Sequence, residues 1–279
     1  MNYLGLDEFL REALREDIGT GDITTESCVP ESAVSYGEFR AKASGVVCGT
    51  EVLRRVFALL DEKVDVTVLL PDGARVEKGG VIAKIEGPSR SILTGERVAL
   101  NLLQHMSGIA TATAEAVEAV SGTGASIADT RKTTPGMRVL EKYAVKTGGG
   151  SNHRFNLSDG VLIKDNHIEA AGGIGKAVAA VRGNIPHTLK VEVETETPEM
   201  VQEALASGAD IIMLDNMTVP QMKEAVALIR GRALTEASGN MGERDLREVA
   251  ETGVDIISIG ALTHTVKALD ISLKFVKKN

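Results

Sequence analysis

The chain has 279 residues, of which 43% are hydrophobic, and its formal net charge is -8. This length suits one large domain or two smaller ones, and the apolar content excludes an intrinsically disordered chain. The negative charge disfavours nucleic acid as a partner, because nucleic-acid binding needs a basic face with many phosphate contacts. The N-terminal segment lacks a signal-peptide core, and no run of about 18 apolar residues occurs. We therefore expect a cytoplasmic protein with no membrane partner.

Residue usage narrows the fold class. Aromatic residues make up only 3% of the chain and tryptophan is absent. The interior must then consist of Val, Ile, Leu, Ala and Met, the usual filling of parallel sheets covered by helices. Cys28 and Cys48 fit no metal-binding spacing and could form at most one disulfide, which favours a reducing compartment. We expect both to be buried or half-buried thiols.

The first third of the chain has the pattern of a small α+β domain. Residues 4–16 carry an apolar stripe at helical spacing. From about 33 to 92, short β-rich runs are separated by the turn signals PDG and EKGG, and one helix is expected near EVLRRVFALL. Residues 94–120 then predict one long helical segment or two in succession.

The rest of the chain alternates apolar runs with amphipathic segments. The expected strands are ASIADT, GVLIKD, TLKVEVET, ADIIMLD, ALTEAS and VDIISIG. The expected helices cover about 136–147, 173–182, 198–207, 219–230 and 242–252. Such alternation predicts right-handed βαβ units and a parallel sheet. Six clear strands, with room for a short further strand near His153, favour an α/β barrel over an open sheet.

Each expected strand ends in a polar residue or a glycine. These residues are Asp129, Thr130, Lys164, Glu194, Asp215, Ser238 and Gly260. In a (β/α) barrel the C-terminal strand ends converge on the face that carries the active site. Because the set contains both signs of charge, it favours a functional site over the mere onset of polarity at strand ends.

Positive charge is concentrated between residues 131 and 164. The segment holds seven basic residues and two acidic ones: Arg131, Lys132, Arg138, Lys142, Lys146, Arg154 and Lys164, with Glu141 and Asp159. Thr134 and Pro135 predict the start of a helix, and the triple glycine at 148–150 predicts its end. Arg131 and Lys132 then lie in the loop before this helix, whose N-terminus itself attracts anions.

The three basic residues inside this helix are ambiguous. Arg138, Lys142 and Lys146 are spaced four apart, so they share one side of the helix. A solvated basic face explains them as well as a binding role does.

The charges indicate a site for small anionic ligands. Several positive groups on one face can hold two or more carboxylates or phosphates. Glu194 and Asp215 beside them suit either Mg²⁺ that bridges phosphate oxygens or stabilisation of a developing positive charge. Small residues in EASGN and SIGAL let backbone N–H groups approach a phosphate. The histidines form no HxH or HExxH pattern, which argues against a fixed zinc site.

Specific motifs occur in a fixed order from EDIGTGDIT to the end of the chain. They are DTRKTTPGMRVLEKYAVKTGGGSNHR, LIKDNH, VEVET, DIIMLDN, EASGN and SIGALTH. With this series the chain resembles the quinolinate phosphoribosyltransferase family, the decarboxylating nicotinate-nucleotide pyrophosphorylases of NAD biosynthesis. The resemblance implies an α/β fold with an N-terminal α/β sandwich domain, followed by an incomplete α/β barrel of roughly seven strands.

The same resemblance implies a domain division and an assembly. The sandwich domain would cover residues 1–108 and the barrel domain residues 109–279, with the C-terminal tail packing back toward the sandwich domain. Family members form homodimers in which one N-terminal domain caps the partner's barrel, and Arg97 matches an arginine donated across that interface. Further assembly into hexamers stays open.

The resemblance also implies roles for individual residues of this chain. Residues that match the grip on quinolinate's carboxylates are Arg131, Lys132, His153, Arg154 and Lys164, and Thr130 is a further substrate-binding candidate. Glu194 and Asp215 match acids near the ribose and the metal, Mg²⁺, which they would hold directly or indirectly. The phosphate loops match Ser238, Gly239, Asn240, Gly260 and Ala261, although many members carry a glycine where Asn240 stands, and Ile259 is a further substrate-binding candidate. Lys132, Lys164, Glu194 and Asp215 are the candidates for catalysis.

The implied reaction joins quinolinate to phosphoribosyl pyrophosphate and yields nicotinate mononucleotide, pyrophosphate and CO2. Three alternatives remain at this point. One is a paralogue of the same fold, such as the molybdenum-operon relative, with another substrate. Another is a barrel aldolase that uses Lys164 to form a Schiff base. The third is a non-catalytic sensor of an anionic metabolite, in which Glu194 and Asp215 form only structural pairs.

Overall fold

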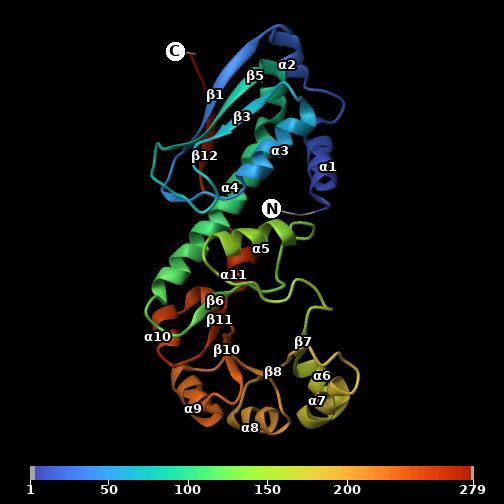
Figure 1. Ribbon diagram of the computed structural model, residues 1–279, viewed down its shortest axis with the longest axis vertical. Helices are drawn as coiled ribbons and strands as arrows, with labels where there is room; N and C mark the ends of the chain where they lie inside the picture. Colours follow the sequence, from blue (N-terminus) through green and yellow to red (C-terminus); the bar gives the residue numbers. More distant parts are fainter. Residues whose placement is uncertain (1–3, 278–279) are drawn as a thin grey trace. The chain divides into compact units, whose positions relative to one another are not determined.

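A computed structural model describes residues 4–277, which divide into two compact units (Figure 1). The first unit contains the described residues up to Ala114, Pro135–Gly149 and the described residues from Val266 onward. The second unit contains Glu115–Thr134 and Gly150–Thr265. Residues 109–114, 135–149 and the described residues from Val266 onward cluster with the first unit, and the expected division at residue 108 stays a prediction.

The first unit is built on an antiparallel sheet with the order β12-β1-β5-β3. Its strands are β1 (Val34–Ala41), β3 (Asp65–Val68), β5 (Val81–Pro88) and β12 (Ile271–Val276), and β2 (Gly45–Val46) pairs separately with β4 (Arg75–Val76). The last strand lies beside the first, since Tyr36 faces Val276 and Ala41 faces Ile271. The C-terminal segment therefore completes a sheet that the N-terminal segment begins.

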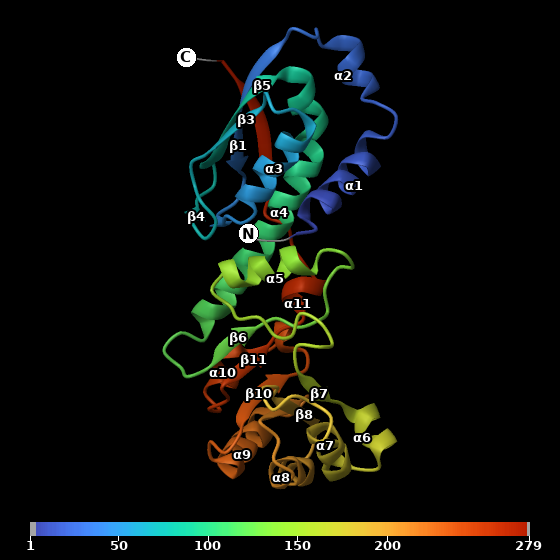
Figure 2. The ribbon, with the colours of Figure 1, turned by 45° about the vertical axis from the view of Figure 1, so that its right-hand side comes forward.

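Helices cover one side of this sheet. The helices that lie in this unit wholly or for most of their length are α1 (Leu6–Ile18), α2 (Ile23–Cys28), α3 (Thr50–Leu60), α4 (Ser89–Ala119) and α5 (Arg138–Thr147). Figure 2 shows α1, α3 and the first half of α4 together on one side of the strands. Phe39 of β1 and Phe57 of α3 are fully buried, with ring centroids 6.3 Å apart, so the sheet and the helices share one core.

The second unit contains a parallel sheet of six strands. These are β6 (Ser126–Ala128), β7 (Val161–Ile163), β8 (Val191–Thr195), β9 (Ile211–Asp215), β10 (Leu234–Ser238) and β11 (Ile256–Ser258). The order β6-β11-β10-β9-β8-β7 joins the first strand to the last, as a barrel does. Ser151 adds a single parallel bridge to Ala128, and no ladder within residues 4–277 joins Ser151 to β7. The barrel is therefore incomplete at that point.

Helices alternate with these strands. They are α6 (Asp165–Ala171), α7 (Ile174–Arg182), α8 (Pro198–Ala206), α9 (Val219–Ile229), α10 (Leu246–Ala250), α11 (Ala261–His264) and the 3₁₀ turn Met241–Glu243. Two of them begin with a threonine cap followed by proline in the first turn: Thr197 accepts the N–H of Met200 at 3.3 Å, and Thr218 accepts that of Gln221 at 3.5 Å. The local sequence thus determines where α8 and α9 begin after the strands that precede them.

The predicted fold class is confirmed, with an antiparallel sheet in the N-terminal part and a parallel sheet in the C-terminal part. The expected helix start at Thr134 and Pro135 is wrong. α5 begins at Arg138, because Gly136 adopts the left-handed conformation (φ 81°) and interrupts the helical path. α6 was not expected, and the helix expected at 242–252 is reduced to Leu246–Ala250.

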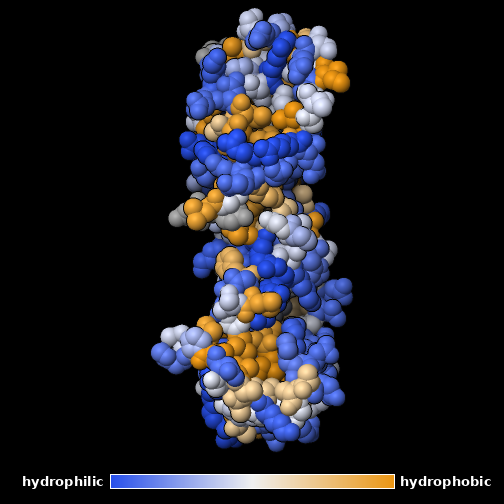
Figure 3. All heavy atoms as spheres, turned by 90° about the vertical axis from the view of Figure 1, so that its right-hand side faces the viewer, coloured by the Kyte–Doolittle hydropathy of each residue, from blue (hydrophilic) through white to orange (hydrophobic). Residues whose placement is uncertain are grey.

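Burial also corrects two expectations. Lys142 is fully buried in the first unit, so it belongs neither to a solvated basic face nor to the cluster of basic residues at the strand ends. Cys48 is buried as expected, whereas Cys28 is exposed. Among residues 4–277, no helix combines the length and the apolar character needed to cross a membrane. On the face shown in Figure 3, hydrophobic side chains form patches separated by hydrophilic ones.

Candidate active site

A cavity of about 330 Å³ lies at the C-terminal strand ends of the second unit. Nine of the predicted site residues line it: Thr130, Arg131, Lys132, His153, Arg154, Lys164, Glu194, Asp215 and Ser238. Leu162, Met213, Glu236 and Ser258 complete the lining. The parallel sheet therefore brings together side chains that the sequence spreads over more than a hundred positions.

Lys164 and Glu194 form an ion pair at the ends of β7 and β8, with Nζ 3.2 Å from Oε2. Burial raises the pKa of Glu194, and the nearby charges of Asp215 and Asp165 act in the same direction against the attraction of Lys164. The backbone N–H of Lys164 donates to Nδ1 of His167 at 3.0 Å, which fixes the start of α6. The pair is thus held at the mouth of the pocket by the entry into a helix.

Asp215 ends β9 and is oriented by its neighbour. The side-chain amide of Asn216 donates to Oδ2 of Asp215 at 2.6 Å, and Asn216 itself is left-handed (φ 55°). A Cβ at Gly239 would lie 2.3 Å from Oδ1 of Asn216, so only glycine fits there. The ends of β9 and β10 therefore meet too closely for a side chain at residue 239.

The loop with Lys132 is hydrogen-bonded to α11, which follows β11. The N–H of Lys132 donates to the Thr130 hydroxyl at 3.0 Å, and the Thr263 hydroxyl donates to the Lys132 carbonyl at 2.8 Å. A Cβ at Gly260 would lie 3.1 Å from Cδ of Lys132. Gly260 thus leaves room for the lysine side chain to run past the end of β11.

Below the strand ends lies a buried layer of His153, Glu192 and Glu236. Nε2 of His153 is 3.2 Å from Oε2 of Glu192 and 3.6 Å from Oε1 of Glu236. Both acids are buried, with residue exposures of 3% and 2%. Burial and the charge of Glu192 raise the pKa of Glu236 to about 7. One proton shared within this layer would relieve the repulsion between its two carboxylates.

These three side chains also have a spacing that could suit a metal ion, since their ligand atoms lie within 4.8 Å of one another. The N–H of Arg154, however, donates to Nδ1 of His153 at 2.7 Å. Nδ1 is then the acceptor, and a neutral ring carries its proton on Nε2, the atom that faces the acids. A proton at that position opposes metal binding there.

Arg154 lies between the pocket and the buried layer. Its Nη1 donates to the carbonyl of Gly160 at 3.1 Å. Burial lowers the pKa of Arg154, the charge of Arg131 lowers it further, and Glu192 and Glu236 act in the opposite direction. Two guanidinium groups therefore converge here beside two buried acids.

The other predicted residues lie elsewhere. Gly239, Asn240, Ile259, Gly260 and Ala261 follow the ends of β10 and β11 without lining the cavity, and Arg97 is an exposed residue of α4 in the first unit. Their roles stay predictions. Four lining residues that were missed, Leu162, Met213, Glu236 and Ser258, each stand two positions before a predicted strand-end residue. Strand periodicity, which puts such residues on the same face, could have found them.

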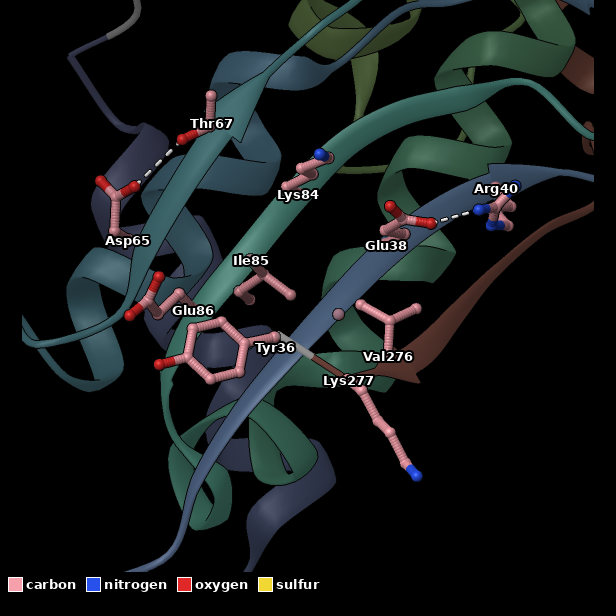
Figure 4. A pocket seen from close by; sticks show the side chains of 11 residues that line it. Tyr36, Glu38, Arg40, Asp65, Thr67, Lys84, Ile85, Glu86, Val276 and Lys277 are labelled. Carbon is pink, nitrogen blue, oxygen red and sulfur yellow. Dashed lines mark hydrogen bonds and ion pairs between the residues drawn. The ribbon is translucent and has the colours of Figure 1, made fainter. Parts of the chain in front are cut away.

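A larger cavity of about 610 Å³ lies on the open face of the sheet in the first unit (Figure 4). Its charged groups interact along single strands: Arg40 pairs with Glu38, and the Thr67 hydroxyl donates to Asp65 at 3.1 Å. The lining contains Glu38, Asp65 and Glu86 together with Arg40, Lys84 and Lys277, so its formal charge balances. This cavity is large, but its lining has no excess of positive or negative charge.

Comparisons with known proteins extend over the whole chain. The model of the family "Quinolinate phosphoribosyl transferase, C-terminal domain" matches residues 109–274, and that of the corresponding N-terminal domain matches residues 22–107. A "Probable nicotinate-nucleotide pyrophosphorylase [carboxylating]" of Bacillus subtilis (strain 168) is 47% identical over 279 residues, which cover 100% of this chain and 96% of that protein.

Two solved structures are similar to this chain over nearly its whole length. NadC from Streptococcus pyogenes is 43% identical, with a TM-score of 0.92 over 99% of this chain and 100% of that one. The nicotinate-nucleotide pyrophosphorylase from Francisella tularensis is 40% identical, with a TM-score of 0.93 over 97% and 96% of the two chains.

Proposed function

Because the chain belongs to the quinolinate phosphoribosyl transferase family, we propose that it joins quinolinate to phosphoribosyl pyrophosphate in NAD biosynthesis. The products are nicotinate mononucleotide, pyrophosphate and CO2. The observation that carries the proposal is the pocket at the barrel's strand ends, where Arg131, Arg154 and two lysines face Glu194 and Asp215. Such a mixed set suits two anionic substrates that generate a cationic sugar.

Quinolinate would bind through its two carboxylates. Arg131 and Arg154 can each form a bidentate pair with a carboxylate, and His153 adds a polar ring at the floor of the pocket. Lys132 and Lys164 supply further positive charge at the rim. This arrangement favours a planar dianion over a singly charged ring.

The two acids serve the sugar and the metal. Departure of pyrophosphate leaves an oxocarbenium-like ribose, whose positive charge the carboxylates of Glu194 and Asp215 would stabilise. Their oxygen donors also fit Mg²⁺, which is usually held by one or two carboxylates together with substrate phosphates. When bound, Mg²⁺ would neutralise charge on the departing pyrophosphate. Mg²⁺ is thus the proposed cofactor, held by Glu194 and Asp215 directly or through water.

Decarboxylation follows from the electronic character of the ribosylated ring. The pyridinium nitrogen accepts the electron pair as the bond from ring carbon 2 to its carboxylate breaks and CO2 leaves. A proton then replaces the carboxylate at that carbon, and Lys132 and Lys164 are the ammonium groups in the pocket that could deliver it. Both lysines would thereby do more than attract the negative charge of the substrate.

The phosphate groups would be held by the loops after the last two strands. Ser238, Gly239 and Asn240 follow β10, and Ile259, Gly260 and Ala261 follow β11. Loops after the final strands of such barrels are the usual phosphate site, and their small residues let backbone N–H groups approach it.

We further propose a homodimer in which Arg97 reaches the partner's pocket. Support comes from the family and from the exposure of Arg97 on α4. Mixing an Arg97→Ala variant with an Asp215→Asn variant should restore activity up to about a quarter of wild type, because one pocket in a mixed dimer is intact. No recovery after subunit exchange would contradict this assignment.

Two free thiols support a cytoplasmic location.

Incubation with quinolinate, phosphoribosyl pyrophosphate and Mg²⁺ tests the proposed function through release of CO2 and formation of nicotinate mononucleotide. Binding of quinolinate without turnover would favour a sensor. Trapping of a carbonyl substrate on Lys164 by borohydride would favour an aldolase. Turnover of another dicarboxylate alone would identify a paralogue with a different substrate.

A further inference from the structure

We propose that Glu192 and Glu236 are positioning residues, a buried carboxylate pair that orients His153 and compensates the charge of Arg154 for binding of the dicarboxylate. Neither acid belongs to the predicted set of site residues. The inference rests on the proposed function and assigns two residues beneath the pocket a role in substrate affinity.

The first argument is the orientation of the His153 ring. Its Nδ1 accepts the N–H of Arg154 at 2.7 Å, while its Nε2 faces Oε2 of Glu192 at 3.2 Å and Oε1 of Glu236 at 3.6 Å. The ring is thus held from both edges. The N–H of His153 also donates to the buried Asp129 at 2.8 Å, which fixes the backbone that carries the ring.

The second argument is charge. Arg131 and Arg154 are close enough to repel each other, and that repulsion must be offset when no substrate is bound. Glu192 and Glu236 attract Arg154 from the buried side. Oε1 of each acid is buried and accepts no hydrogen bond within residues 4–277, so the negative charge that the pair keeps after sharing one proton is not compensated by local donors. The acids therefore supply a counter-charge that keeps Arg154 at the pocket.

The third argument is placement. Glu192 stands two positions before Glu194 on β8, and Glu236 two positions before Ser238 on β10. In each case the acid shares a strand face with a pocket residue one layer above it. A further cavity of about 560 Å³, lined by Ile211 and Ile256, lies against the same layer. The layer is therefore a partition between two cavities, where charge and hydrogen bonds rather than tight packing must hold it.

The test measures steady-state kinetics of Glu192→Gln and Glu236→Gln beside wild type. Glutamine keeps the shape of the side chain and removes its charge. We expect the KM for quinolinate to rise roughly five- to thirtyfold, as for a weakened charge-assisted contact. The kcat and the KM for phosphoribosyl pyrophosphate should stay within about twofold of wild type, because each acid stands two positions before the strand-end residues proposed to serve the sugar and the phosphates.

Glu141→Gln is the matched control. Glu141 is fully buried and pairs with His105 in the first unit, with Oε1 2.9 Å from Nε2. It therefore repeats the loss of a buried carboxylate beside a histidine away from the pocket. Its thermal unfolding should shift about as much as that of the test variants, while its KM for quinolinate stays unchanged.

A second measurement uses the wild-type protein and does not depend on the folding of a variant. Nitrogen NMR of the labelled histidines should show a proton, and no metal ion, on Nε2 of His153. A metal-bound Nε2, or a stoichiometric divalent ion in the purified protein that Glu192→Gln loses, would overturn the inference. If the wild type turns over normally and the glutamine variants keep its KM for quinolinate, the inference is overturned while the proposed function stands. Absence of wild-type turnover would overturn the proposed function and the inference together.

Discussion

The two units of this protein carry two cavities that differ in what their walls can do. The first, of about 610 Å³, lies on the open face of an antiparallel sheet. The second, of about 330 Å³, lies where parallel strands end. In the first cavity, neighbouring groups such as Glu38 and Arg40 neutralise each other along one strand. In the second, charges of both signs arrive from different strands and line one pocket, where Lys164 and Glu194 pair across two strand ends.

The difference follows from sheet geometry. Side chains on the face of an antiparallel sheet stand side by side and point the same way, so opposite charges pair with their neighbours. The ends of parallel strands in a barrel point to a common centre, so side chains from distant segments face one another. Convergence of charge, rather than cavity size, therefore singles out the candidate active site.

The largest effect is expected from the acids of the second cavity. Asp215→Asn or Glu194→Gln should lower kcat at least a hundredfold, since preorganised electrostatic stabilisation is commonly worth about that much. Asp65→Asn, the matched change in the first cavity, should leave kcat unaltered because Asp65 interacts with Thr67 on its own strand. Equal kcat values for Asp215→Asn and Asp65→Asn would abolish the distinction between the two cavities.

A smaller loss is expected from the basic residues. Arg131→Ala or Lys164→Ala should lower kcat/KM for quinolinate at least tenfold with the fold intact, because a charge-assisted bond contributes roughly 1.5 to 3 kcal/mol. Lys84→Ala is the control, since Lys84 lines the first cavity. Circular dichroism verifies folding, and unchanged kinetics in either test variant would refute the carboxylate-binding role.

A pH effect on stability is expected from the buried layer. Burial and Glu192 raise the pKa of Glu236 from an ordinary value of 4.5 to about 7, so folding favours its protonated form. The stability gained from this protonation is fully present below about pH 4.5 and is lost as the pH rises through about 7.

Glu236→Gln should therefore flatten the decline in unfolding free energy between pH 5 and 8 by roughly 1 to 3 kcal/mol. Urea unfolding of wild type and variant at several pH values measures this difference. Parallel curves for the two proteins would show that Glu236 does not titrate in this range.

The smallest effect on catalysis is expected from the first unit. Asp72 accepts hydrogen bonds from the N–H of Gly49, the N–H and hydroxyl of Thr50, and the hydroxyl of Tyr143. Asp72→Ala should cost roughly 2 to 4 kcal/mol of unfolding free energy through these lost contacts. Activity per folded molecule should stay constant, and a fall in kcat of the fully folded variant would show that Asp72 contributes to the chemistry as well as to stability.

Sequence patterns predicted the strands well because each strand's apolar run stops at a polar residue. β8 and β9 end at Thr195 and Asp215, within the segments expected from VEVET and IIMLD. The same reasoning reached Glu194 but not Glu236, although strand periodicity puts Glu236 on the same face as Ser238. Its partner His153 lies more than eighty positions away and meets it only in the closed sheet.

Local pattern also failed where tertiary packing decides. Lys142 follows Arg138 at helical spacing on a segment rich in charge, yet α5 packs so closely that a Cβ at Gly148 would lie 2.4 Å from the carbonyl of Ala110. This close packing buries Lys142, although lysine side chains are usually exposed. The start of α5 was misplaced because Pro135 predicts a first helical position, and the left-handed Gly136 behind it cancels the signal.

The pairing of β12 with β1 has a consequence for how the protein is made. β1 is synthesised early, but its neighbour on one edge comes from residues 271–276, after the whole second unit. A nascent chain on the ribosome therefore holds an open strand edge throughout most of translation, and such edges recruit foreign strands. The first unit to appear is the last to be finished, so chaperone capture during synthesis should centre on Val34–Ala41.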